Sequence, residues 1–252
     1  MKRKLQALLV LLTLGGLKLP VEQAATRYLR EAKLLSLPLD MSVRDSIGQM
    51  GFAASLGGLR SLVASITYLQ AYTAWTNVDW AKVDTYFTLT TSLQPRYERY
   101  WDEAAWHMAY NAASNYRNNP KLNAAVREKL YKDHIQRGVD ILKQGLHLLP
   151  NSALLWKSLG ETYERRSREP KLAADAYMEV YRITQRLHFA RLAAYQYALT
   201  EDPVLWQKAY SLLKDSYDKN QRTPSLINTL KELEEKLKIP TLSRIQDEVK
   251  KT

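Results

Sequence analysis

Residues with catalytic or metal-binding chemistry are few in this chain and stand far apart. The four histidines are His107, His134, His147 and His188, and no two of them lie three or four residues apart. The chain has no cysteine, and it contains neither the H-E-x-x-H motif of zinc enzymes nor the G-x-S-x-G motif of serine hydrolases. The sequence therefore predicts no metal, no cofactor and no enzymatic activity.

A basic cluster is the second group of residues that could bind a ligand. Arg165, Arg166, Arg168 and Lys171 follow one another closely at an expected turn between two helices. Two interpretations stay open, a solvated turn and a site for an anion. A nucleic-acid-binding protein would normally add stacking aromatics or a recognised fold to such a cluster, so no nucleic-acid partner is expected.

The composition is that of a basic globular protein. Hydrophobic residues make up 46% of the 252 residues and charged residues 25%, which argues against a disordered chain. Lys and Arg number 37 against 26 Asp and Glu, a net charge of +11. This charge permits an anionic surface as a partner but does not require one.

The first residues have the form of a targeting segment. Met1 to Lys4 is basic, and the stretch from Leu5 to Leu17 carries no charge. As a helix this stretch would span only about 20 Å, less than the ~30 Å hydrocarbon core of a bilayer. We therefore expect a cleaved signal or a retained signal-anchor in residues 1–18, with membrane association through residues 5–17. The remaining chain would be exported or membrane-anchored on the non-cytoplasmic side, and a buried helix of a cytoplasmic protein is the alternative.

The elements that must position these residues are all helices. No stretch alternates apolar and polar residues with the period of a strand, whereas long runs rich in Ala, Leu, Tyr, Lys and Glu follow residue 59. Prolines preceded by capping residues mark several helix starts. The expected breaks are Pro95, Asn118 to Pro120, Pro150, Pro170, Asp202-Pro203 and Thr223-Pro224.

An internal repeat suggests how the helices pack. A proline precedes a tryptophan by six residues twice, as Pro95 to Trp101 and Pro150 to Trp156. After the second tryptophan the chain reads W-x2-L-G-x2-Y, and in this motif it resembles the tetratricopeptide repeat (TPR) family. The resemblance covers roughly residues 60–220. It implies an all-α, TPR-like α-solenoid of antiparallel helix hairpins, with small residues where helices approach closely. The repeat-packing residues that it implies are Trp101, Gly138, Leu142, Gly145, Trp156, Leu159, Gly160, Tyr163, Ala173 and Tyr177.

The same resemblance implies a ligand-binding surface. In this family, regularly spaced positions of the first helix of each repeat line a concave groove. Here those positions carry mostly aromatic residues in the N-terminal half and charged residues in the next repeat. Burial of the aromatic rings in a core is the competing interpretation. The implied groove residues are Tyr68, Tyr72, Trp75, Trp106, Tyr110, Lys157 and Arg165.

These observations predict an order of domains and a function. Residues 1–18 would be the signal or anchor helix, 19–58 an N-terminal helix and irregular linker, 59–222 the repeat domain, and 223–252 a capping helix and tail. The expected function is a non-enzymatic scaffold that binds a protein or peptide partner in the aromatic-lined groove, at or beyond the membrane. The alternatives are a module that binds glycan or cell-wall polymer and an accessory subunit of a membrane complex.

Overall fold

The computed structural model describes Ala24 and residues 58–245, and the described part is helical without strands. The all-α prediction is thus confirmed for these residues. They form two compact units, the first from residues 58–100 with 147–149 and the second from residues 101–146 with 150–245. Each unit is described by itself. The predicted signal or anchor in residues 1–18, and all of the 19–58 segment except Ala24 and Gly58, lie outside the described residues.

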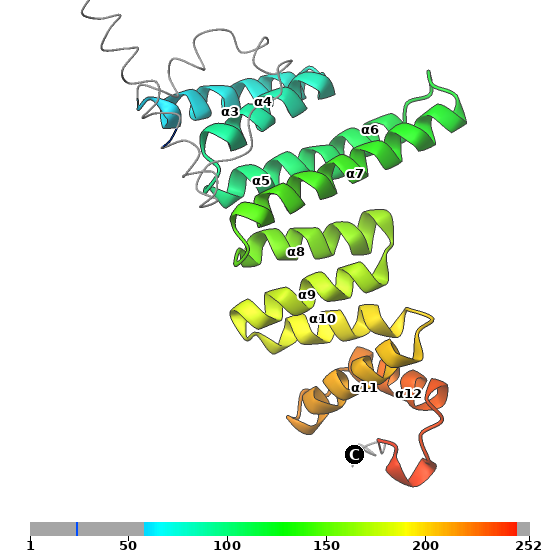
Figure 1. Ribbon diagram of the computed structural model, residues 1–252. Coiled ribbons are helices and arrows are strands. Elements are labelled where there is room, and N and C mark those ends of the chain that lie inside the picture. Colours follow the sequence, from blue (N-terminus) through cyan, green and yellow to red (C-terminus); the bar gives the residue numbers. More distant parts are fainter. Residues whose placement is uncertain (1–23, 25–57, 246–252) are drawn as a thin grey trace, which may run out of the picture. The chain divides into compact units, whose positions relative to one another are not determined.

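The first unit is built on a pair of helices, α3 (Arg60–Thr76) and α4 (Trp80–Leu93), which lie side by side (Figure 1). Small residues on α3 let the two helices approach, and Ala64 packs against Leu89 and Leu93 in the core between them. The Thr67 and Thr90 hydroxyls, 2.8 Å apart, form a buried hydrogen bond across the pair. The core between these two helices therefore contains a pair of buried threonines that satisfy one another.

The second unit begins with a continuous helical run. This run consists of α5 (Glu98–Trp106), the π-helical segment η1 (His107–Ala112) and α6 (Ala113–Arg117). The helices that follow are α7 (Ala124–Leu148), α8 (Ala153–Thr162), the π-helical η2 (Tyr163–Ser167), α9 (Pro170–Thr184), α10 (Leu187–Ala198), α11 (Pro203–Asp218), α12 (Pro224–Lys236) and the short 3-10 helix η3 (Thr241–Ser243).

Local sequence sets the helix starts. The side chains of Ser152, Asp202 and Thr223 each accept a hydrogen bond from a backbone N–H in the first turn of α8, α11 and α12. The Trp156 indole N–H donates to the carbonyl of Pro150 at 2.9 Å, which links the helix to the turn before it. Trp206 makes the same bond to the carbonyl six residues before it, at 2.6 Å. The residue six positions before Trp206 is Thr200 and not a proline, so the proline–tryptophan spacing in the sequence did not predict this bond.

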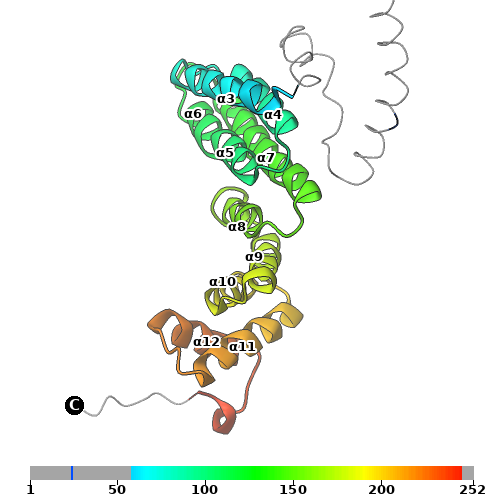
Figure 2. The ribbon, with the colours of Figure 1, turned by 90° about the vertical axis from the view of Figure 1, so that its left-hand side faces the viewer.

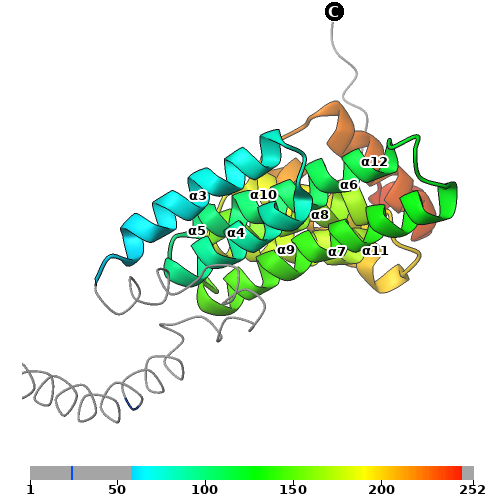
Figure 3. The same ribbon diagram turned by 90° about the horizontal axis from the view of Figure 1, so that it is seen from above.

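Packing in the second unit is mostly between neighbours along the chain. Each helix from α8 to α11 packs against the one that follows, and Figures 1 and 2 show α8, α9 and α10 in that order. α7 lies along the α5–η1–α6 run in Figures 1 and 3, and Ala113, Tyr131 and Ile135 form a buried cluster between them. This hairpin is long, because α7 alone has 25 residues.

Gly138 marks the closest approach of α7 to this run, and replacing it with alanine should destabilise the protein. A Cβ there would lie 2.6 Å from the Ala109 Cβ and 2.8 Å from the Ala105 carbonyl oxygen, a backbone atom that cannot move alone. The clash should cost about 1–3 kcal/mol and exceed the ~1 kcal/mol that alanine contributes through helix propensity. Urea unfolding measures the difference, with Gln144→Ala at an exposed position of α7 as the control. Unchanged or higher stability of Gly138→Ala would contradict this packing.

Candidate functional site

The predicted groove residues divide between the two units. Within each unit the structure brings its members together, so that two separate aromatic or mixed surfaces result. The first unit holds Tyr68, Tyr72 and Trp75, and the second holds Trp106, Tyr110, Lys157 and Arg165.

In the first unit the three predicted residues belong to a longer aromatic row. The Tyr72 ring centroid lies 5.1 Å from that of Tyr68 and 5.9 Å from that of Trp75, as expected for side chains one turn apart on α3. Tyr100 extends the row, with its ring 5.2 Å from Tyr68 and 4.6 Å from Tyr97. Tyr68 and Tyr72 are half-buried in contact with other rings, whereas Trp75 is 36% exposed. The row is therefore partly core and partly surface.

In the second unit Trp106 is the large aromatic residue that faces solvent. It ends α5 and is 49% exposed, whereas Trp101 on the same helix is 4% exposed. Tyr110 follows one turn later in η1, is half-buried, and lies near Thr162 at the end of α8. Burial raises the pKa of the Tyr110 hydroxyl, so it stays protonated at neutral pH.

Contacts on both sides of Trp106 join its helix to α8. One turn before it, the Asp102 carboxylate accepts a hydrogen bond of 2.5 Å from the Ser158 hydroxyl. One turn after it, Tyr110 lies near Thr162. Because these contacts lie one turn to either side, Trp106 occupies the same edge of the run, next to α8. Burial is also the main cause that raises the pKa of the Asp102 carboxyl.

The neighbouring edge of α8 and η2 is charged. The Lys157 ammonium lies 2.9 Å from the Glu161 carboxylate, one turn further along the helix, and Arg165 follows after another turn. Both residues of the ion pair are partly exposed, so the pair orients the two side chains but stabilises the fold little. We name Asp102, Trp106, Tyr110, Lys157, Glu161 and Arg165 the α5–α8 face. Four of these residues belong to the predicted groove set, and the same helical spacing also marks Asp102 and Glu161.

Arg166 ties the two π-helical segments together, a role that the sequence did not indicate. Its Nε donates to the Ala109 carbonyl oxygen and its Nη2 to the Ser114 hydroxyl, both at 2.9 Å. Its guanidinium also lies 5.0 Å from the centroid of the Tyr110 ring. π-Helical turns often occur at functional sites, and here one of them supports Tyr110 and the other carries Arg165 and Arg166. The only signal in the sequence was the cluster of arginines.

The predicted packing residues are buried with one exception. Trp156 is half-buried, because its indole N–H reaches back to the carbonyl of Pro150 and its ring lies near the surface. Gly145 contacts Trp101 and Leu155, and Gly160 contacts Tyr177. The buried members of the set are Trp101, Gly138, Leu142, Gly145, Leu159, Gly160, Tyr163, Ala173 and Tyr177.

No protein-family model matches this chain, and no curated protein matches it. Within the described residues, no three His, Asp or Glu side chains gather closely enough to hold a metal ion. Among the helices that the structure describes, none combines the length and the apolar character needed to cross a membrane. The candidate binding surfaces of the described residues are the aromatic row of the first unit and the α5–α8 face of the second.

Proposed function

We propose that this chain is a non-enzymatic scaffold of TPR-like helical repeats that binds a protein or peptide segment on the α5–α8 face. The observation that carries the proposal is the exposure of Trp106 between two interhelical contacts and beside a charged edge. Aromatic side chains of this kind dominate binding energy at protein interfaces, where they are surrounded by polar groups that set orientation.

The chemistry of the face indicates what a partner should present. An apolar side chain of the partner would pack on the Trp106 indole, which loses little entropy on binding because its helix already fixes its backbone. The Lys157–Glu161 pair and Arg165 offer both signs of charge on the adjacent edge. We expect a segment with an apolar anchor, flanked by polar residues, at least one of them acidic to meet Arg165.

The solenoid is part of the same proposal. Successive packing of α8 to α12 supports stacked hairpins, because a single hairpin cannot bury its apolar face. The charged face of the last helix, α12, is suited to close such a stack toward solvent. We further propose that residues 1–18 export or anchor the chain, on the basis of the basic start and the apolar stretch that follows it.

A Trp106→Ala variant tests the binding proposal. Full-length protein, immobilised, should capture protein partners, and the variant should bind the captured partner about 2 kcal/mol more weakly, roughly thirtyfold in dissociation constant. Thermal stability should change little, because half of the Trp106 side chain is already in water. Val204→Ala, which is 74% exposed on α11, is the control and should bind as the parent does.

The other outcomes are equally informative. If Trp106→Ala loses several kcal/mol of stability, as truncation of a core aromatic does, Trp106 is a packing residue and the proposal is wrong. If no protein partner is captured but cell-wall polysaccharide is retained in a Trp106-dependent manner, the glycan-binding alternative replaces it. Equal weakening by Val204→Ala would show that the binding is not located on this face.

A further inference from the structure

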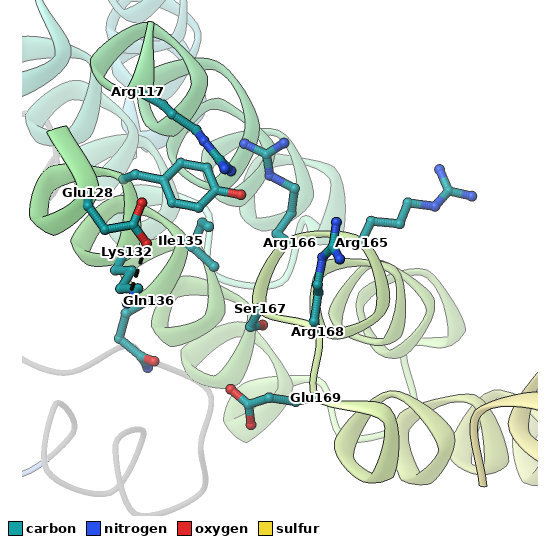
Figure 4. A pocket seen from close by; sticks show the side chains of 11 residues that line it. Arg117, Glu128, Lys132, Ile135, Gln136, Arg165, Arg166, Ser167, Arg168 and Glu169 are labelled. Carbon is teal, nitrogen blue, oxygen red and sulfur yellow. Dashed lines mark ion pairs between the residues drawn. The ribbon is translucent and has the colours of Figure 1, made fainter. Parts of the chain in front are cut away.

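A basic pocket of about 590 Å³ lies in the second unit, apart from Trp106 (Figure 4). The end of α6 and the first half of α7 form one wall, and η2 with the turn into α9 forms the other. Two carboxylates, Glu128 and Glu169, also line it, so that the side chains around it carry a net charge of +3. The cationic residues of the lining are Arg117, Lys132, Arg165, Arg166 and Arg168.

Most of this positive charge is not compensated inside the protein. Lys132 is paired with Glu128 at 3.3 Å. Within the described part of the chain, by contrast, no carboxylate oxygen lies within 4.0 Å of the guanidinium of Arg117, Arg165 or Arg168. Figure 4 shows Arg117 and Arg166 extending toward one another, whereas Arg165 extends away from them. Two guanidinium groups that extend toward one another repel, and an anion bound between them would relieve this repulsion.

Tyr131 places its ring close to both converging arginines. The Arg117 guanidinium carbon is 4.4 Å from the centroid of its ring, and that of Arg166 is 5.3 Å away. The side chain is buried, at 9% exposure, and it lines the pocket. Within the described residues no side chain or backbone group is hydrogen-bonded to its hydroxyl, and this oxygen is not among the buried unpartnered atoms, so it is open to solvent at the pocket. The pocket therefore contains a phenol group with unused hydrogen-bonding capacity.

The arginine on the opposite wall is held in place before any ligand arrives. Arg166 uses one N–H on the Ala109 carbonyl and another on Ser114, which leaves three of its five N–H donors for the pocket. A guanidinium fixed in this way loses little entropy when it binds an oxyanion, and its planar donors match phosphate oxygens in pairs.

From these contacts we infer that the pocket binds a phosphate group. Arg117 and Arg166 donate to its oxygens, Tyr131 donates from the wall, and Arg168 adds charge at the turn. A phosphate group at neutral pH carries a charge of about −1.5 to −2, and so it fits a surplus of +3 better than a single carboxylate does. Free phosphate and a small phosphomonoester share this chemistry, and the pocket is large enough for either.

Calorimetric titration of the full-length protein at constant ionic strength tests the site. The probes are inorganic phosphate and glycerol phosphate, with acetate as the carboxylate control. We expect saturable binding of one phosphate per chain, with a dissociation constant of about 1 mM or lower. Tighter binding of glycerol phosphate would identify a phosphomonoester as the ligand, and equal or weaker binding would identify free phosphate. Acetate should not saturate the site.

Variants decide whether the binding is at this pocket. Arg117→Gln should weaken phosphate binding about tenfold, the size of effect expected for loss of one charged hydrogen-bonding partner. Tyr131→Phe keeps the ring and removes only the hydroxyl, so it should fold normally and weaken binding several-fold. Arg186→Gln removes the same charge at an exposed position between α9 and α10 and should bind as the parent does.

Three results would overturn the inference. These are the absence of saturable phosphate binding, equal weakening by Arg186→Gln and Arg117→Gln, and binding of acetate as tight as that of phosphate. Far-UV circular dichroism of each variant separates loss of binding from loss of folding. Because Trp106 is not part of the pocket, failure here leaves the proposed interaction on the α5–α8 face untouched.

Discussion

Replacing Gly160 with leucine is expected to lower the free energy of unfolding by about 3 kcal/mol, at the upper end of the range for overpacking. A Cβ at this position would already lie 2.8 Å from Cε1 and 2.9 Å from Cδ1 of Tyr177, and leucine adds three further carbons. The ring cannot move aside easily, because Tyr177 is 2% exposed and its hydroxyl donates a hydrogen bond to Glu164. Interiors packed at crystal density do not accommodate such a volume without shifting α8 away from α9.

Urea unfolding and thermal melts measure this effect, and 3 kcal/mol corresponds to a fall of roughly 6–12 °C for a domain of this size. Gln144→Leu, at an exposed position of α7, introduces the same side chain without a clash and should melt near the parent. A Tyr177→Ala background provides a sharper control. There the leucine enters the space left by the ring, so the cost of Gly160→Leu should shrink. If Gly160→Leu melts with the parent, the packing of α8 on α9 at this glycine is wrong.

Acidification from pH 6.5 to pH 4 is expected to remove about 3 kcal/mol of stability through His107 alone. This histidine opens η1, is 2% exposed, and its Nδ1 is 3.1 Å from the Asn111 side-chain amide. Burial lowers its pKa from 6.5 to about 4 in the folded protein. The unfolded chain therefore takes up a proton below pH 6.5 while the folded chain does not. Stability is fully present above pH 6.5, falls through this window, and levels off below pH 4.

The difference in pH dependence between the parent and His107→Gln measures this contribution. His188, whose pKa is also lowered, and Asp102, whose pKa is raised, occur in both proteins and cancel in the comparison. The parent should lose about 3 kcal/mol more than the variant between the two ends of the window, whatever their stabilities at neutral pH. Parallel curves for the two proteins would show that His107 titrates normally in the folded state and is not buried as described.

Some features of this structure can be predicted from the sequence, and others cannot. The helix starts could be predicted because they depend on local chemistry. Asp202 before Pro203 and Thr223 before Pro224 cap their helices through bonds spanning two or three residues. The contact of Gly160 with Tyr177 was also predictable, because the two residues belong to neighbouring helices joined by a short turn.

The candidate sites depended on contacts that no local pattern carries. Trp101 and Trp106 are residues of the same kind on the same short helix, yet one is 4% and the other 49% exposed. Which of them faces solvent is decided by α7, whose Gly145 contacts Trp101, and by α8, whose hydrogen bond to Asp102 fixes the edge on which Trp106 lies.

The π-helical segments add a second reason. A π turn holds more residues than an α turn, so α-helical spacing carried past the end of η1 or η2 no longer predicts the face on which a residue lies.

The sequence by itself determined the all-helical class, the breaks that a proline marks and the glycines at which helices approach, because these follow from interactions over a few residues. The breaks between α3 and α4 and between α9 and α10 carry no proline and were not among the predicted breaks. The tertiary structure decided which aromatic residues reach solvent, that His107 is buried, and that Arg117, Tyr131 and Arg166 share one pocket. These last three residues come from separate helices. Only the packing of these elements against one another brings the Tyr131 ring within 4.4 Å of the Arg117 guanidinium carbon and 5.3 Å of that of Arg166.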